Sequence, residues 1–469
     1  MRQERTVQAT IFEVFAGHQI GCELKSISGW LDGQRALISL VASDLRREGL
    51  RQTGRRGLPA ETVLRCALLK QQRQLSYEEL AFHLEDSASF CAFARLPLAW
   101  SPKKSVLQRT VSAIRPETWE AVNRALIASA RQEKLEKGAM VRIDSTVTAA
   151  LVHEPSDSAL LWDAVRLMRR LLRQAAALPG APAMRWHDRR RMAKRCASAI
   201  AYSRGKDNRR RLYRKLIAAT HATRAALLRA AKRLTGLAGI AVERWRAQVD
   251  HYLPLIARVL TQSERRVLHG QAVPASDKLV SLFEPHTDII VKGGRDVQYG
   301  HKLNLVTGKS GLILDIVIEA GNPADAERFL PMLDRHIARC GAPRQMAADG
   351  GYASRDNLNE AKARGVTDVA FHKKRGLAVA DMTKSAWVYR KLRNFRAGIE
   401  AGISCFKRAY GGGRCTWRGL DHFKAYVWSA VVACCSPASN RHRACRRQPH
   451  RNGDPLNPAR LPLHARRVP

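Results

Sequence analysis

Residues 394–407, NFRAGIEAGISCFK, are the segment from which we work out the fold of this 469-residue chain. The segment has no proline, and the three glycines at 411–413 predict that a helix ends there. Arg396, Glu400 and Lys407 are spaced by four and then seven residues, so they share one helix face at about 100° per residue. A carboxylate between two cations stays ionised, as a metal ligand must. A solvated row of ion pairs has the same pattern.

Two acids upstream are candidates to join Glu400. Asp144 lies inside a predicted strand at 139–152, where an aspartate is disfavoured and needs a partner, either a cation or a structural hydrogen bond. Asp349 follows a predicted strand at 344–348, and two glycines come next, which we interpret as room for a substrate backbone. Clustered carboxylates repel one another unless a metal neutralises them. Two Mg²⁺ ions about 4 Å apart would do so, and would activate a water or a 3′-hydroxyl against a phosphodiester.

The remaining elements predict the fold class. A long helical insertion at 157–275 follows the first strand, and a short strand is predicted after it at 279–283. Without the insertion, the order is strand, strand, strand, helix, strand, helix, strand, helix. This order favours an α/β fold with an RNase H-like mixed sheet. We therefore predict an RNase H-like catalytic domain at 138–435, interrupted by a basic helical insertion.

The other parts of the chain are predicted from composition and periodicity. Residues 1–58 are a basic N-terminal segment. Residues 59–137 are an all-helical, helix-turn-helix-like DNA-binding domain, with a bundle that only packs or dimerises as the alternative. Residues 436–469 are rich in Pro, Arg, His and Asn, which predicts a disordered basic tail.

Charge points to a polyanionic partner. Lys and Arg number 81 against 41 Asp and Glu, a net charge of +40, which favours nucleic acid over a typical metabolic substrate. Between Leu161 and Gly270 there are 26 Lys or Arg and 6 Asp or Glu, so about half of the excess lies in the insertion. The ten cysteines form no C-x-x-C pair, and the N-terminus lacks the apolar core of a signal peptide. We expect a protein of the bacterial cytoplasm, associated with the nucleoid.

Several motifs in order resemble one family, the insertion-sequence transposases of the DDE type, and most closely the ISNCY group. Arg396, Glu400 and Lys407 match the family's signature Y-x2-R-x3-E-x6-K, although Arg393 stands in the tyrosine's place. The other motifs are LSYEEL at 75–80, SFCAFARL at 89–96, DST at 144–146, DSALLWD at 157–163, YGHK at 299–302, GNPAD at 321–325 and ADGGY at 348–352.

The resemblance implies a transposase that binds the terminal inverted repeats of its element, cleaves DNA there and transfers the strands to target DNA. It implies a DDE triad of Asp144, Asp349 and Glu400 holding two Mg²⁺, with Mn²⁺ as a substitute, and phosphate contacts from Arg396 and Lys407. It also implies a homodimer or higher oligomer on double-stranded DNA. The alternatives are a non-catalytic basic DNA-binding protein and a host RNase H-like nuclease. Because related proteins continue the last helix with an apolar stretch, the change at Cys434-Cys-Ser-Pro leads us to expect a frameshifted C-terminus.

Overall fold

The computed structural model describes residues 19–46, 57–97, 100–292 and 296–436. Residues 1–18 and 47–56 of the predicted basic N-terminal segment, and all but the first residue of the predicted tail at 436–469, lie outside these ranges. No helix in the described ranges is long and apolar enough to cross a membrane.

The N-terminal third is helical. Its elements are α1 (Gln19–Asp32), α2 (Arg35–Leu45), α3 (Ala60–Gln72), α4 (Tyr77–Asp86), α5 (Ala88–Phe93), α6 (Lys104–Val111) and α7 (Pro116–Gln132). The start of α4 is set by a capping box, in which the Ser76 side chain accepts from the Glu79 N–H and the Glu79 carboxylate accepts from the Ser76 N–H. Inside the helices, Arg65 is fully buried and pairs with Glu61 and Asp32, which joins α3 to α1.

A mixed sheet of six strands follows. The strands are β1 (Met140–Ala149), β2 (Asp288–Lys292), β3 (Asp296–Gly308), β4 (Ile313–Ile318), β5 (Gln345–Ala348) and β6 (Asp368–Phe371). β1 is central, antiparallel to β3 and parallel to β5, and β5 is parallel to β6. β2 and β4 both pair with β3, which gives the order β4-β3-β1-β5-β6 with β2 beside the start of β3. This mixed α/β arrangement is consistent with the RNase H-like fold that the sequence predicted.

The strand predicted at 279–283 is wrong. This segment has no strand structure, and the first strand after the insertion is β2, which begins at Asp288. Leu279 and Leu282 are instead buried in the core of the insertion. The apolar pattern therefore reflects packing against helices, because a short apolar run looks the same in both settings.

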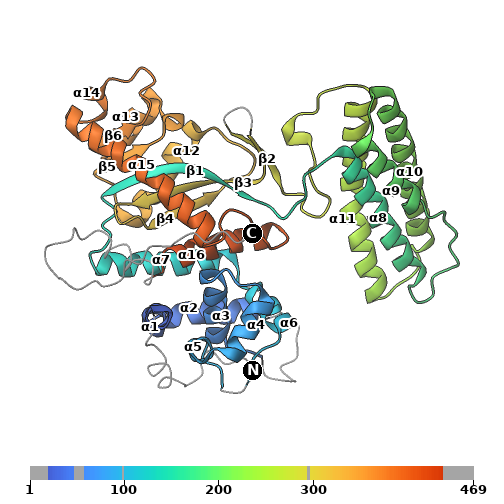
Figure 1. Ribbon diagram of the computed structural model, residues 1–469, viewed down its shortest axis with the longest axis horizontal. Helices are drawn as coiled ribbons and strands as arrows, with labels where there is room; N and C mark the ends of the chain where they lie inside the picture. The colour runs from blue at the N-terminus through green and yellow to red at the C-terminus, as the bar shows by residue number, and fades with distance from the viewer. Residues whose placement is uncertain (1–18, 47–56, 98–99, 293–295, 437–469) are drawn as a thin grey trace, which may run out of the picture.

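Helices cover the sheet and connect it to the N-terminal third. They are α12 (Asp325–Cys340), α13 (Arg355–Ala363), α14 (Val379–Met382), α15 (Ala386–Ala409) and α16 (Leu420–Cys434). α15 crosses the strands β1, β5 and β6, as Figure 1 shows. α16 packs against α3, α7 and β4, so that one apolar core runs from α1 to α16.

The insertion between β1 and β2 has a core of its own. Its helices are α8 (Asp157–Ala176), α9 (Arg190–Tyr202), α10 (Lys206–Arg233) and α11 (Ile240–Ser263), and they stand beside the sheet in Figure 1. The apolar cluster of the insertion is separate from the one beneath the sheet. Arg209, Arg210 and Arg211 lie exposed on α10.

A buried arginine fixes α15 on the sheet. Arg142 of β1 donates from Nη1 to the carbonyl of Phe395 and from Nε to the Thr307 hydroxyl (2.9 Å), and its guanidinium lies 4.6 Å from the Phe395 ring centre. The approach requires a glycine on α15, since a Cβ atom at Gly398 would lie 2.6 Å from Arg142 Nη1. At Gly402, one turn further on, a Cβ atom would meet nothing within 4 Å.

These two glycines form a matched pair for a stability test. Gly402→Ala should stabilise the protein by up to about 1 kcal/mol, because alanine is the better helix former. Gly398→Ala gains the same propensity but displaces Arg142 from its carbonyl partner, so it should be less stable than Gly402→Ala by about 1–3 kcal/mol. Urea unfolding followed by circular dichroism measures both. Equal stabilities would contradict the assigned role of Arg142.

Candidate active site

The register of the sheet brings Asp144 and Asp349 together. Ile143 of β1 pairs with Ala348 of β5 in a parallel ladder, so the residues that follow them are neighbours at one edge. Asp144 lies within β1, and Asp349 comes directly after β5. The parallel pairing therefore brings together two acids that lie 205 positions apart in the sequence.

Arg396 connects these two acids to Glu400. From α15, its Nη2 atom lies 2.9 Å from Asp144 Oδ2 and 3.6 Å from Asp349 Oδ1, and its Nη1 atom lies 3.1 Å from Glu400 Oε1. The three acids that the sequence singled out thus converge on one guanidinium. The intrahelical Arg396–Glu400 pair expected of an ordinary surface helix is present as well, but it forms one side of a larger cluster.

The four side chains of the cluster differ in their exposure to solvent. The side chains of Arg396 and Asp144 are 11% and 13% exposed, whereas Asp349 is 40% and Glu400 is 70% exposed. Asp144 is further held by the N–H of Ser145, which donates to Oδ1 at 2.8 Å. The Nε atom of Arg396 is buried without a hydrogen-bond partner within the described ranges. Three carboxylates against one guanidinium leave the cluster with an excess of negative charge.

The donor chemistry of the cluster fits a divalent cation. Its ligand atoms are carboxylate oxygens, which hard cations such as Mg²⁺ prefer, and the excess negative charge favours a second cation beside the guanidinium. The spacing is set by Arg396, which lies between the acids. Among the residues that the structure describes, no three His, Cys, Asp or Glu side chains lie close enough together to share an ion.

The sequence did not predict a chain of buried, hydrogen-bonded polar side chains near the carboxylate cluster. Tyr352 is buried and donates from its hydroxyl to Asn304 Oδ1 at 2.7 Å, and Asn304 donates to Glu319 Oε1 at 2.8 Å. Burial raises the pKa of Tyr352 well above its usual value, and the nearby charges of Asp325 and Asp144 add to the shift. The available signal was Asn304, a polar residue in the middle of the apolar strand β3.

The two glycines after Asp349 have a reason that differs from our interpretation. A Cβ atom at Gly350 would lie 2.6 Å from Lys373 Cβ, and one at Gly351 would lie 2.9 Å from Asp325 Oδ2. Packing against Lys373 therefore already favours glycine at 350, whereas at 351 a side chain would displace the Asp325 carboxylate. Asp325 in turn pairs with Lys302 at 2.7 Å, which places a further ion pair behind the turn.

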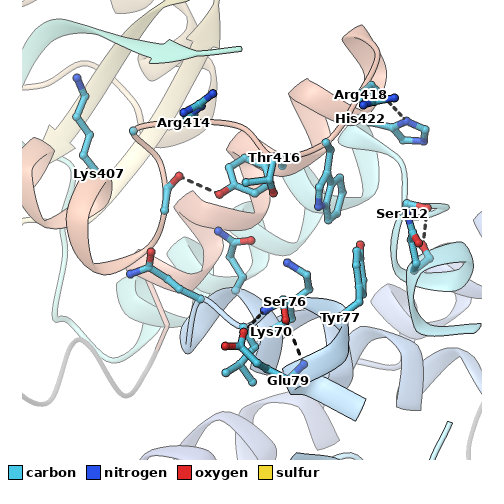
Figure 2. Close-up of a pocket in the computed structure, with 18 residues that line it drawn as sticks. Lys70, Ser76, Tyr77, Glu79, Ser112, Lys407, Arg414, Thr416, Arg418 and His422 are labelled. Atoms are coloured by element: carbon cyan, nitrogen blue, oxygen red, sulfur yellow. Dashed lines mark hydrogen bonds between the residues drawn. The ribbon is translucent and has the colours of Figure 1, made fainter. Parts of the chain in front are cut away.

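The remaining residues of the signature lie apart from the cluster. Lys407 is among the residues that line a separate cleft between α3 and the segment that joins α15 to α16, and Figure 2 shows it at the edge of that cleft. Arg393, which stands in the tyrosine's place, is exposed on α15. One turn earlier, Tyr389 donates from its hydroxyl to the carbonyl of Phe371 at 2.9 Å, so a tyrosine does anchor this helix to β6.

The charge balance of the cluster can be measured with a double-mutant cycle. Arg396→Gln leaves neighbouring carboxylates without their counter-charge and should lower the free energy of unfolding by about 2–3 kcal/mol. Adding Asp144→Asn relieves the repulsion, so the double variant should lose at least about 1 kcal/mol less than the sum of the two single variants. Urea titrations in EDTA measure the cycle. Arg393→Gln is the matched control and should change stability by less than about 0.5 kcal/mol. Additive losses would show that the two residues do not interact.

Comparison with known proteins adds one finding to this geometry. No curated protein and no solved structure matches the chain. A family model does match residues 291–435, a range that contains Asp349, Arg396, Glu400 and Lys407 and that excludes Asp144. That model describes a transposase DDE domain, and the match supports a DDE-type transposase.

Proposed function

We propose that the chain is the transposase of an insertion sequence, of the kind found in the ISNCY group. It binds the terminal inverted repeats of its element, cleaves the DNA there and transfers the strands to target DNA. The observation that carries the proposal is the convergence of Asp144, Asp349 and Glu400 on Arg396. Two of these acids lie within the matched transposase domain, and the third comes from the central strand beside it.

In this proposal the three carboxylates hold two Mg²⁺ ions, for which Mn²⁺ can substitute. When bound, the ions activate the attacking water or 3′-hydroxyl and stabilise the leaving oxygen. Asp144 is already oriented by the Ser145 N–H, and Asp349 and Glu400 are accessible from solvent. Arg396 offsets part of the negative charge of the acids before DNA arrives. Its guanidinium has the geometry to bind phosphate oxygens through two parallel N–H groups, so it can pass from carboxylate to phosphate at the same place.

In this proposal, basic surfaces away from the carboxylate cluster bind the parts of the DNA that lie outside the site. The exposed arginines at 209–211 on α10 have no acidic run opposite them on that helix, and the insertion carries about half of the net charge of +40. We propose that the insertion and the N-terminal helices contact element ends and target DNA, that the protein acts as a homodimer or higher oligomer, and that it works at the bacterial nucleoid.

The proposal is tested by removing one carboxylate. Asp349→Asn should reduce strand cleavage at the element ends to background, because a neutral amide is a poor ligand for a divalent cation, while leaving end binding largely intact. The assay uses DNA that carries the repeats flanking the gene, with Mg²⁺ or with EDTA. Asp381→Asn, which removes an exposed carboxylate from α14, is the control and should cleave like the unmodified protein.

Cleavage by Asp349→Asn at the normal rate in Mg²⁺ would refute the assignment. Binding without cleavage by the unmodified protein would favour a non-catalytic DNA-binding protein. Cleavage of DNA from a gene that lacks flanking repeats would favour a host nuclease of the same fold.

A further inference from the structure

A large cleft separates the N-terminal helices from the end of α15. It has a volume of about 1020 Å³ and is lined by α3, α4 and α6 on one side and by the segment from α15 to α16 on the other. Figure 2 shows Lys70 and Tyr77 on the helical side, with Lys407, Arg414 and Arg418 on the opposite side. None of the proposed metal ligands lines this cleft.

The walls of the cleft are joined by direct hydrogen bonds. Gln71 of α3 and Gln74, which lies in the turn after α3, donate from their side-chain amides to the carbonyls of Tyr410 and Arg408, each at 2.7 Å. The Tyr426 hydroxyl of α16 donates to the carbonyl of Gly411 at 3.0 Å. Because the two glutamine side chains connect both sides, the cleft is a fixed part of the fold.

Charge in the cleft is strongly one-sided. Four Lys or Arg side chains line it, namely Lys70, Lys407, Arg414 and Arg418, against a single carboxylate, that of Glu79. Glu79 already accepts from the Ser76 N–H in the capping box. Cations gathered in one concave surface repel one another, and a bound polyanion would remove that repulsion.

Lys70 lies at the base of the cleft and is only 7% exposed. Its ammonium group lies 4.8 Å from the centre of the Tyr77 ring. Burial lowers the pKa of Lys70 to about 8, an effect that Cys415 and Glu79 oppose. A buried lysine without a close carboxylate is costly in a free protein, and a bound anion would stabilise its charged form.

Two further polar groups that line the cleft make no hydrogen bond within the described ranges. The indole Nε1–H of Trp417 and the hydroxyl of Tyr77 are buried, and neither has a hydrogen-bond partner in the described part of the chain. Buried donors are nearly always paired in folded proteins, so such exceptions require an explanation. Trp417 can only donate, which suits an anionic acceptor.

Two segments of the chain, α15 and the end of β1, connect the cleft to the carboxylate cluster. Lys407 follows Glu400 by seven residues on α15, a rise of roughly 10 Å, or about three nucleotide steps along a DNA strand. On the other side, the loop before Trp417 pairs with the end of β1, the strand that carries Asp144. The N–H of Ala149 donates to the Gly413 carbonyl at 3.0 Å, and the N–H of Cys415 donates to the Ala149 carbonyl at 2.8 Å.

We propose that this cleft binds the phosphate backbone of the DNA strand that runs on from the carboxylate cluster, with Lys70, Arg414, Arg418 and Trp417 as contact residues. The inference rests on the proposed function for its ligand. The number of cations that line the cleft, four, favours a strand with several phosphates over a single free phosphate. The N-terminal helices thereby contribute to strand positioning through α3 and α4, in addition to any groove contact elsewhere.

The test measures DNA binding as a function of salt. Arg414→Gln and Arg418→Gln change exposed side chains and should each lower the slope of log Kd against log salt by about 0.9 and weaken binding roughly fivefold at low salt. Trp417→Phe keeps an aromatic side chain but removes the N–H, so it should weaken binding without changing the slope. Lys362→Gln, an exposed position on α13, is the matched control for charge and should leave the slope unchanged.

The outcomes separate this inference from the proposed function. If the unmodified protein cleaves element ends but the cleft variants bind with unaltered slope, the cleft inference fails alone. If no cleavage occurs yet the slopes fall as expected, the cleft binds DNA and the transposase assignment fails. Inorganic phosphate at millimolar concentration provides a second arm. Stabilisation of the protein by phosphate, with unaltered DNA slopes, would indicate a small-anion pocket and overturn the proposal.

Discussion

The guanidinium of Arg396 contacts carboxylates from three elements that are far apart in the chain. Asp144 comes from the central strand, Asp349 from the turn after β5, and Glu400 from the helix that carries the arginine itself. This cation offsets part of the mutual repulsion of the three carboxylates, and it matters most for Asp144, the most buried of them. The position of α15 over the sheet therefore depends on the ion pairs of Arg396 as well as on apolar packing.

Other features of the fold serve to hold that helix in place. Arg142 donates from the sheet to the Phe395 carbonyl, at the residue before Arg396, and this contact explains the glycine at 398. At its far end, α15 is tied to α3 and the turn after it by the side-chain amides of Gln71 and Gln74. The N-terminal helices and the sheet also share one apolar core. The insertion has an apolar core of its own.

The same geometry links two kinds of charged surface. The carboxylate cluster has an excess of negative charge and suits divalent cations, whereas the cleft beside it has an excess of positive charge and suits phosphates. A nucleic-acid strand that passes from one to the other would present its reacting phosphodiester to the acids while its next phosphates rest on lysine and arginine. If the carboxylate cluster binds metal ions and the cleft binds phosphates, an acidic site is expected even in a protein with a net charge of +40.

Periodicity and spacing in the sequence were sufficient to identify Glu400 and its neighbours on one helix face, the strand around Asp144 and a mixed α/β fold, because these features depend on local repeats and on residue chemistry. The segment 279–283 was misassigned, since an apolar run does not tell whether it will pair with a strand or pack on a helix. Only the tertiary structure decided that Arg396 lies between all three acids, that Arg142 fixes α15, and that Lys407 lines a different cleft. These contacts join residues separated by up to 253 positions, and their distances depend on strand register and helix docking, which no local pattern encodes.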